Sequence, residues 1–141
     1  MTKPIIGWRE WVALPGFGVD RIKAKIDTGA RTSALHAFDI HLFQKEGQEW
    51  VRFAVHPLQK NDRDSRTCAC PVHDVRTVTN SGGGREERIV IKTTLSLGGK
   101  AWPIEITLTN RDQMGFRMLL GRTAIRQHYL VHPGKSFCLE Q

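Results

Sequence analysis

Hydrophobic and polar residues alternate along short stretches of this chain, with the period of two that is typical of β-strands. Gly, Pro, Asn or Asp bounds each stretch, as expected where strands end in turns. The pattern is strongest over residues 11–14, 22–26, 50–55, 88–94 and 102–108, which we predict to be strands.

Turn and helix signals complete this pattern. Residues 16–18 (Gly-Phe-Gly) separate the first two predicted strands, and residues 98–99 (Gly-Gly) predict a tight hairpin. Residues 122–129 have the pattern of a short helix, which residues 132–134 (His-Pro-Gly) would end. The sequence therefore predicts an all-β protein with one short helix near its C-terminal end.

Two polar segments interrupt the predicted strands. Residues 59–66 are polar without periodicity and predict an exposed loop within one domain. Residues 81–84 (Ser-Gly-Gly-Gly) lie between the strand-like residues 76–79 and 88–91. We therefore expect a long hairpin with a Gly-rich tip, as in a mobile lid over a binding site.

The length and composition fit a single compact domain. A chain of 141 residues has room for one hydrophobic core, so we expect one domain over residues 1–141. Its 40% hydrophobic and 25% charged residues exclude disorder as the main state. No apolar run approaches the roughly 18 residues of a membrane span, and residues 1–8 lack a signal-peptide core. We therefore expect a cytoplasmic protein without a membrane partner.

The cysteines and the net charge narrow the function classes further. Cys68, Cys70 and Cys138 are odd in number, and one residue separates the first two, so we expect reduced thiols. The chain has 21 Lys and Arg against 14 Asp and Glu, which gives a formal net charge of +7. This excess predicts an acidic partner, but charge alone does not choose among nucleic acid, an anionic surface and an acidic peptide.

The sharpest chemical signal is an Asp-Thr-Gly sequence at the end of a predicted strand. The strand would deliver the Asp27 carboxylate, while Thr28 and Gly29 would turn the backbone and offer hydroxyl and N–H donors that hold it. A bare Asp-Thr-Gly is most often a simple β-turn, so a second signal is needed. Residues 118–122 (Met-Leu-Leu-Gly-Arg), followed by the predicted helix, supply it.

These features, in this order, resemble aspartic proteases of the retroviral type. In that family an Asp-Thr-Gly-Ala strand end is followed by an apolar strand, Gly-Arg and a short helix, with a flap hairpin between them. The wording of residues 26–36, 102–112 and 116–122 resembles the RimB-type bacterial branch, whose members are described as retropepsin-like or as ATP-dependent zinc proteases. The resemblance extends from Gly7 to about Pro133.

The resemblance implies a closed β-barrel that is active as a two-fold homodimer. It implies catalytic roles for Asp27, Thr28 and Gly29, with one Asp27 from each subunit activating water. Viral relatives carry acidic residues after the Ala, whereas this chain has Arg31. The Gly-Arg arginine, Arg122, therefore needs another acidic partner, and Glu10 and Glu140 are the candidates.

Basic residues cluster in the sequence where a bound peptide would lie. Lys23 and Lys25 share a strand face with Asp27, and an ammonium close to the carboxylate would favour its ionised form and cleavage near neutral pH; an ordinary exposed strand face is the competing interpretation. The charges favour an acidic, extended peptide. The expected substrate-binding residues are Lys25, Ala30, Arg31, His36, Gly82, Gly83, Arg85 and Arg88.

RimB-type proteins are linked to RimK-type ligases, which add glutamates to a ribosomal protein. The resemblance therefore implies trimming or removal of such glutamate tails. The alternative is a non-catalytic dimeric module that binds acidic peptide tails or RNA.

The zinc description of the family raises the question of whether this chain has a metal site. Cys68, Cys70 and His73 offer ligand types for zinc, but one-residue spacing is tight for a tetrahedral site and no second cluster completes it. The sequence also has no phosphate-binding Gly-Lys-Ser/Thr motif. We expect no metal and no other cofactor.

Overall fold

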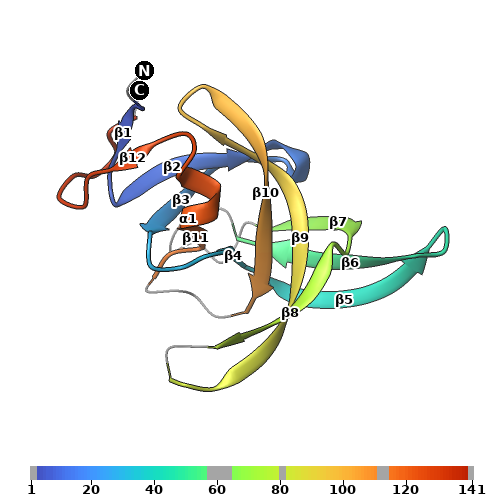
Figure 1. Cartoon of the computed structure of the whole chain (residues 1–141). Helices are drawn as coiled ribbons and strands as arrows, with labels where there is room; N and C mark the ends of the chain where they lie inside the picture. The colour runs from blue at the N-terminus through green and yellow to red at the C-terminus, as the bar shows by residue number, and fades with distance from the viewer. Residues whose placement is uncertain (1–2, 57–64, 80–81, 111–114, 140–141) are drawn as a thin grey trace.

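Figure 1 shows a computed structural model of the chain, which describes residues 3–56, 65–79, 82–110 and 115–139. Strands dominate these residues, together with a 3-10 turn and a short α-helix, so the mostly-β prediction is confirmed. The elements in chain order are β1 (Ile5–Ile6), β2 (Arg9–Leu14), η1 (Pro15–Phe17), β3 (Val19–Asp27), β4 (Ser33–His36), β5 (Phe38–Lys45), β6 (Gln48–Val55), β7 (Arg66–Pro71), β8 (Asp74–Thr79), β9 (Arg85–Leu97), β10 (Lys100–Thr109), β11 (Met118–Gly121), α1 (Arg122–Ile125) and β12 (Leu130–Val131).

The main sheet has seven strands in the order β10-β4-β11-β3-β2-β9-β8. Strand β10 also pairs with β9, so the sheet curls back on itself (Figure 1). Strands β2 and β9 meet at a single residue pair, Ala13 with Ser96, which makes this seam the weakest part of the ladder. The observed architecture is a curled sheet with a seam, a coarser result than the closed barrel that the resemblance implied.

The hydrophobic core lies inside the curled sheet, because apolar residues occupy alternate strand positions. In β3, Ile22 and Ile26 are buried in the core, while Lys23, Lys25 and Asp27 occupy the alternate positions on the other face. The predicted placement of both lysines on the strand face of Asp27 is therefore confirmed. The sheet has an apolar inner face and a more polar outer face.

The predicted tight hairpin at residues 98–99 is confirmed. Strands β9 and β10 pair antiparallel on either side of it. Gly98 and Gly99 have φ angles of 62° and 82°, a left-handed conformation that glycine adopts without strain. The first turn, at residues 16–18, is also confirmed, and it begins as the 3-10 helix η1.

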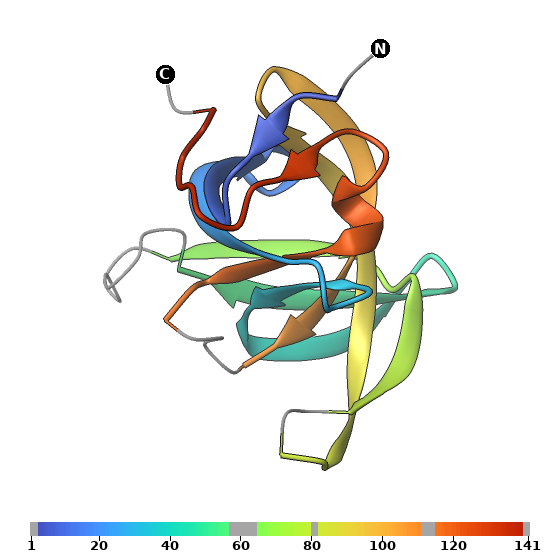
Figure 2. The same ribbon diagram turned by 60° about the vertical axis from the view of Figure 1, so that its left-hand side comes forward.

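The long hairpin with the Gly-rich tip is confirmed on both sides of its turn. Strands β8 and β9 pair from Asp74 with Val90 to Thr79 with Arg85. Figures 1 and 2 show this hairpin projecting from the rest of the sheet. Ser81 lies outside the described residues. We call the part of β8 and β9 between residues 74 and 90 the lid hairpin.

A second antiparallel sheet, with the order β5-β6-β7, forms an arm beside the main sheet (Figure 1). Strand β5 is an edge strand, and its pairing with β6 shifts register between Phe38 and His41. Asp39, within this shift, has a φ of 50°. Leu42 and Phe43 are among the exposed large hydrophobic residues.

The helix is shorter than the sequence predicted. α1 covers Arg122–Ile125, and residues 126–128 continue as turns. The chain leaves the helical path where Tyr129 turns into the core and donates from its hydroxyl to the Leu97 carbonyl oxygen at 2.7 Å. Among the described residues, none of the helical segments combines the length and hydropathy needed to traverse a bilayer.

Of the predicted loop over residues 59–66, the structure describes residues 65 and 66 alone. Residues 57–64 lie outside the described residues, and Arg66 already belongs to β7. The sequence pattern did not predict β4, β5 and β7, which are four, eight and six residues long.

A buried carboxylate ties the C-terminal segment to the start of the chain. Glu10, on β2, is 1% exposed. Its Oε2 accepts hydrogen bonds from the N–H groups of Gly7 and Cys138, both at 2.7 Å, and its Oε1 accepts one from Leu139 at 3.2 Å. Since a buried carboxylate is tolerated when backbone donors surround it, this cluster accounts for the charge in the core.

Replacing Glu10 by alanine leaves three backbone donors without their acceptor. We expect Glu10→Ala to lower the free energy of unfolding by about 3 kcal/mol. Glu10→Gln keeps one acceptor oxygen and is expected to lose less. Urea denaturation of both variants measures the effect, with Glu87→Gln as the control, since Glu87 is exposed on β9. An unchanged midpoint for Glu10→Ala would contradict the assignment.

Candidate active site

Backbone groups hold the Asp27 carboxylate at the end of β3. The N–H of Gly29 donates to Asp27 Oδ1 at 3.0 Å, and the N–H of Ala30 donates to the Asp27 carbonyl oxygen at 3.1 Å. A Cβ at position 29 would lie 3.2 Å from that Oδ1, so a side chain would crowd the carboxylate. Asp27 is half-buried, and Thr28 beside it is exposed. The turn thus orients a carboxylate that solvent or a ligand can still reach.

Strand β11 lies beside β3 and supports this turn. It pairs parallel with β3, and the register sets Gly121 opposite Asp27. A Cβ on Gly121 would lie 2.7 Å from the carbonyl carbon of Thr32, which no side chain can accommodate without a backbone shift. The N–H of Gly121 also donates to Ser33 Oγ at 3.1 Å. Glycine is therefore required where the two chain segments touch.

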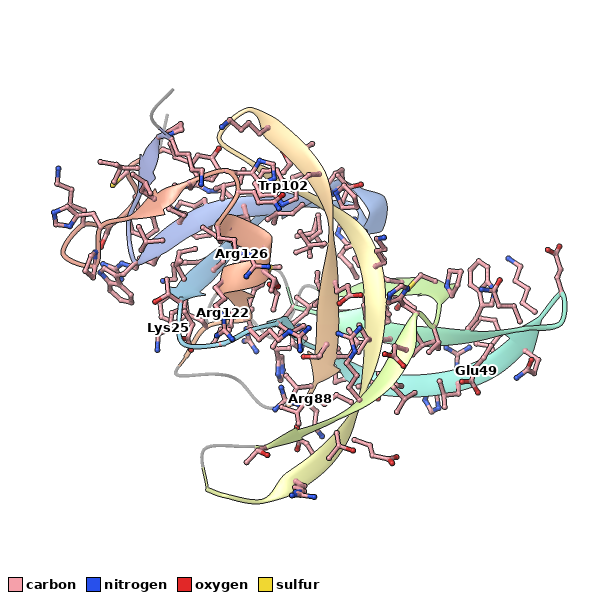
Figure 3. All side chains as sticks on the ribbon, in the orientation of Figure 1. Lys25, Glu49, Arg88, Trp102, Arg122 and Arg126 are labelled. Atoms are coloured by element: carbon pink, nitrogen blue, oxygen red, sulfur yellow. The ribbon has the colours of Figure 1, made fainter. Side chains whose placement is uncertain are left out.

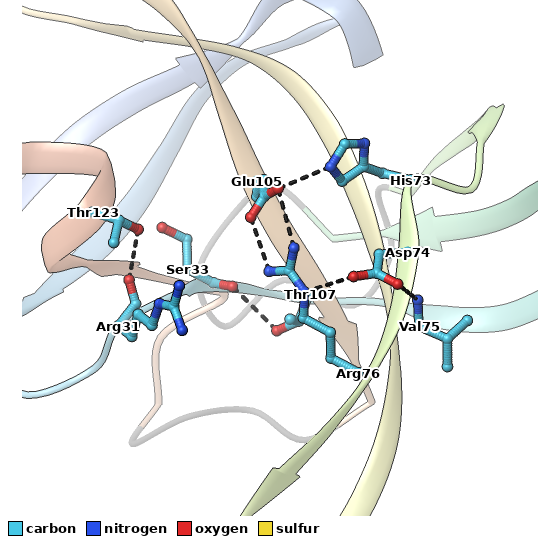
Figure 4. Close-up of polar contacts among 9 residues, drawn as sticks. All are labelled: Arg31, Ser33, His73, Asp74, Val75, Arg76, Glu105, Thr107 and Thr123. Atoms are coloured by element: carbon cyan, nitrogen blue, oxygen red, sulfur yellow. Dashed lines mark hydrogen bonds and ion pairs between the residues drawn. The ribbon is translucent and has the colours of Figure 1, made fainter.

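The start of α1 provides donors for the carbonyls of the Asp27 loop. Arg122 Nη1 donates to the Gly29 carbonyl oxygen at 3.2 Å, and the Arg122 N–H donates to that of Ala30 at 2.8 Å. Thr123 Oγ1 donates to the Arg31 carbonyl oxygen at 2.6 Å (Figure 4). The two motifs found in the sequence therefore form one bonded unit.

The expected acidic partners of Arg122 need correction. Glu10 does not serve, because its carboxylate is buried and bonded to the backbone N–H groups described above. Glu140 lies outside the described residues. Arg122 is exposed, and its Nη1 donates to the carbonyl oxygen of Gly29, while the expectation for Glu140 stays a prediction.

The outer face of the sheet links Asp27 to the lid hairpin. Paired residues on neighbouring strands point to the same face, so the strand register can be followed from strand to strand. One such row crosses β3, β11, β4, β10, β9 and β8 at Lys25, Leu119, Ala34, Thr107, Val90 and Asp74. The row ends at Lys25 on β3, and Asp27 lies two residues further along that strand, on the same face. We call this face of the sheet the Asp27 face, and Leu119, Ala34, Thr107 and Val90 within it are buried.

The structure brings most of the expected substrate-binding residues to this surface or to its loops. Lys25 stands on the Asp27 face, and Ala30 and the exposed Arg31 belong to the Asp27 loop. His36 ends β4 on the same face. At the projecting end of the lid hairpin, Gly82, Gly83 and Arg85 are exposed.

Arg88 is placed differently from the expectation of a free charge on the hairpin. It is 9% exposed, and its Nε forms an ion pair with Glu86 Oε1. Figure 3 shows Arg88 on β9 within the lid hairpin. Burial and this ion pair leave Arg88 little capacity to contact a peptide.

An ionic network at the base of the lid hairpin was missed by sequence reasoning. Arg76, on β8, bonds Asp74 through Nε at 2.9 Å and Glu105 on β10 through Nη1 at 2.8 Å (Figure 4). His73 Nε2 lies 2.8 Å from Glu105 Oε2. The hydrogen bond from Arg76 is the main cause that lowers the pKa of Glu105, and likewise that of Asp74. This network anchors β8 to β10.

The residues considered for zinc do not fit a metal site. Metal ligation requires thiolates, but burial raises the pKa of Cys68 and raises that of Cys70 to about 11. His73 is bonded to Glu105 instead. Within the part of the chain that the structure describes, no group of three or more His, Cys, Asp or Glu is placed to hold a metal ion.

A strand-end Asp-Thr-Gly turn that is bonded to a Gly-Arg strand end, in a chain that also has a long hairpin, is typical of the retropepsin-like class. Residues 5–141 match a family described as RimB-like, "Retropepsin-like aspartic endopeptidase RimB", and the chain belongs to that family. The suspected resemblance to RimB-type proteins is confirmed.

Two similar relatives are larger proteins. Each is described as "Probable alpha-L-glutamate ligase", one from Shewanella pealeana and one from Shewanella halifaxensis, and each is 50% identical to this chain. The matches cover 98% and 99% of this chain but 30% and 31% of the relatives. The chain therefore spans about a third of the length of these curated relatives.

A solved structure shares the fold. It is the crystal structure of a protein of unknown function from Legionella pneumophila, 29% identical in sequence, with a TM-score of 0.80. The match covers 97% of this chain and 98% of the other. The two proteins therefore share their overall fold over nearly the full length of both chains.

A side chain at position 121 should separate the two halves of the site. We expect Gly121→Ala to lower the free energy of unfolding by about 2–4 kcal/mol, because the new Cβ meets backbone atoms that cannot rotate away. Urea denaturation measures the loss. Gly134→Ala is the matched control, since its Cβ would meet the ring of the exposed His132 alone. Equal losses in the two variants would contradict the close contact.

The network at the lid base predicts a pH dependence. Because Arg76 lowers the pKa of Glu105 in the folded protein, ionised Glu105 stabilises the hairpin above the usual carboxyl pKa of about 4.3. That stabilisation is lost as the pH falls through the lowered pKa. We expect Glu105→Gln to reduce amide-exchange protection in β8 at pH 7, and to approach the wild type as the pH falls through the lowered pKa of Glu105. Exchange equal to the wild type at pH 7 would refute the anchoring role; Glu87→Gln is the control.

Proposed function

We propose that this chain is an aspartic-type peptidase that acts as a two-fold homodimer. The observation that carries the proposal is the Asp27 turn, in which the Gly29 N–H fixes the carboxylate and the start of α1 braces the loop. Aspartic peptidase chemistry needs two carboxylates that share a proton. One chain carries one Asp-Thr-Gly sequence, so Asp27 of the partner subunit would supply the second carboxylate.

The paired carboxylates would activate a water molecule. Two carboxylates about 3 Å apart cannot both ionise easily, so the pair titrates as a unit and shares one proton. The ionised Asp27 would take a proton from water as its oxygen attacks the scissile carbonyl, and the protonated one would donate to the carbonyl oxygen. The Thr28 residues of the two subunits would contact each other across the two-fold axis. The barrel would close around the pair of Asp27 carboxylates.

The charge around the site favours an acidic, extended peptide. Lys25 is on the Asp27 face, Arg31 is exposed in the loop, and Arg122 and Arg126 are exposed at the two ends of α1 (Figure 3). Opposite charge on the substrate would speed its encounter and fix its register. Lys25 shares the strand face of Asp27, and we propose cleavage near neutral pH.

The relatives point to glutamate tails as the substrate. A peptidase that works beside a ligase for α-linked glutamate would trim or remove the ligase product. We therefore propose glutamate tails, such as those that a RimK-type ligase adds to a ribosomal protein, as the substrate, and the ligase as a functional partner in the cytoplasm.

Mass spectrometry of a poly-α-glutamate-tailed peptide tests the proposal directly. We expect wild-type protein at about pH 7.5, with chelator present, to shorten the tail, and Asp27→Asn to abolish turnover. Asp20→Asn is the control, because Asp20 is an exposed carboxylate at the start of β3. Mixing wild-type protein with excess Asp27→Asn should also reduce activity, since mixed dimers hold one ionisable Asp27.

Other outcomes separate the alternatives. Tails that bind but are never shortened would replace the peptidase with a module that binds acidic tails. Binding of single-stranded RNA that falls by about 0.7 log units per log unit of salt for each phosphate contact would favour the RNA-binding alternative. Activity that disappears with chelator would contradict a metal-free mechanism.

A further inference from the structure

Basic side chains extend along β3 from Asp27 toward the start of the strand. Arg21, Lys23 and Lys25 alternate with buried apolar residues, so all three share the face of Asp27. Arg9, on β2, pairs with Lys25 and adds a fourth cation to this face. We call Arg9, Arg21, Lys23 and Lys25 the basic track. Arg9, Arg21 and Lys23 have no role in the mechanism above.

Few acidic side chains offset this charge on the two strands. β2 and β3 carry Glu10, Asp20 and Asp27. Glu10 is buried, and its carboxylate accepts the backbone hydrogen bonds described above. Asp20 is exposed at the start of β3 and marks the outer end of the basic track. The strand face between Asp20 and Asp27 is therefore positively charged.

Aromatic rings hold two of these cations in place. The Arg21 guanidinium lies 4.2 Å from the centre of the Trp11 ring, and Lys23 Nζ lies 5.4 Å from that of Phe116. A cation over a ring keeps its N–H donors for other partners, because the ring attracts it by its π-electrons. Side chains that are already held lose less conformational freedom when they bind a ligand.

The outer end of the basic track lies at a cavity of about 250 Å³. Arg21 and Trp11 line this cavity, together with Ser96 and the turn at residues 98–99. Asp20 lines it too, so the cavity itself has one charge of each sign and the positive excess lies along the track. Because Arg21 is exposed and borders this space, a ligand on the track can reach it.

The spacing of the cations on β3 matches that of charges on an extended acidic peptide. Alternate residues of a strand are about 6.6 Å apart, so Arg21, Lys23 and Lys25 repeat at that interval. Alternate side chains of an extended peptide have the same repeat and point to one side. Asp27 follows Arg21 by six residues, which is about 20 Å or six residues of such a peptide.

The ring contacts favour an acidic peptide over single-stranded RNA. Single-stranded RNA is bound in large part by bases that stack on aromatic side chains. Trp11 is stacked on Phe137, with ring centres 6.0 Å apart, and also contacts Arg21. The Trp8 ring has the Arg9 guanidinium over it at 4.7 Å. These rings therefore position cations, and cations at a regular spacing suit a row of carboxylates.

We propose that the basic track binds the part of an acidic tail that extends beyond the Asp27 site, with alternate carboxylates paired to successive cations. The proposal rests on the proposed peptidase function and adds a second binding site for the same substrate. Exposed ion pairs are individually weak, so the affinity grows with the number of pairs that one tail forms. The track therefore makes binding depend on tail length, up to about six residues from the scissile bond.

Cleavage of glutamate tails of two lengths tests the track. Three glutamates held at Asp27 span about 10 Å and reach neither Lys23 nor Arg21, whereas ten glutamates reach both. For the ten-glutamate peptide we expect Arg21→Gln/Lys23→Gln to raise KM about 3- to 20-fold with kcat nearly unchanged, since the track touches no reacting atom. For the three-glutamate peptide we expect a change of less than about twofold. Equal losses on both peptides would show a structural role and overturn the proposal.

A matched control separates the track from the net charge of the protein. Lys45 and Arg52 are exposed on the arm, and Lys45 Nζ lies 4.4 Å from the centre of the Trp50 ring. Lys45→Gln/Arg52→Gln removes the same charge and a similar ring contact, and we expect it to leave both KM values unchanged. Arg21→Lys/Lys23→Arg keeps the charges and is expected to retain the preference for the long tail. An equal rise of KM in the arm variant would overturn the proposal.

A binding measurement separates the track from the peptidase itself. Fluorescence anisotropy of a labelled ten-glutamate peptide is measured with Asp27→Asn and with Asp27→Asn/Arg21→Gln/Lys23→Gln. We expect the second variant to bind about 3- to 20-fold more weakly, and the Trp11 indole NMR signal of the first to shift on binding. This result without any wild-type cleavage would remove the peptidase but keep the track. Equal binding by both variants would remove the track whether or not the wild type cleaves.

The same measurement with a single-stranded RNA of ten nucleotides tests the competing ligand. We expect the RNA to bind Asp27→Asn more weakly than the ten-glutamate peptide does. Tighter binding of the RNA, weakened by Arg21→Gln/Lys23→Gln, would assign this face to RNA and overturn the proposal.

Discussion

The parallel pairing of β3 with β11 is the constraint on which the site depends. It joins segments far apart in the chain, since Gly29 and Arg122, which bond across them, are 93 residues apart. Because Gly121 has no side chain, the loop after Asp27 can rest directly on the start of α1. Without this contact, the carbonyl groups of the sharp turn at the strand end would lack hydrogen-bond donors. The same contact therefore positions the carboxylate and satisfies the backbone around it.

Local signals explain what the sequence predicted well. Alternation placed Lys25 and Asp27 on one face because a strand has a period of two, and the glycines at 98 and 99 marked their hairpin because it needs positive φ. The Asp-Thr-Gly turn was likewise recognised from a local sequence signal. Strand β5 was not predicted, although Phe38, Ile40 and Leu42 alternate with polar residues, and in the structure none of its eight residues is buried.

Contacts set by register could not be read from the chain. Arg76 meets Glu105 because β8, β9 and β10 pair in one particular alignment, and Arg88 is buried by that same alignment. Two charges in a sequence carry no information about which strands will lie between them. Glu10 was a candidate partner of Arg122 by analogy, whereas its carboxylate accepts backbone N–H groups and a backbone oxygen accepts a hydrogen bond from Arg122.

The register shift in β5 bears on how the protein avoids self-association. An edge strand presents unpaired N–H and C=O groups that can template aggregation. The exposed hydrophobic side chains of Leu42 and Phe43 favour association at this edge. The shift beside Asp39 bends the strand, so a second flat strand cannot align along its whole length. Lys45, at the other end, adds charge to the edge. The register shift and Lys45 therefore both disfavour the addition of a further strand along this edge.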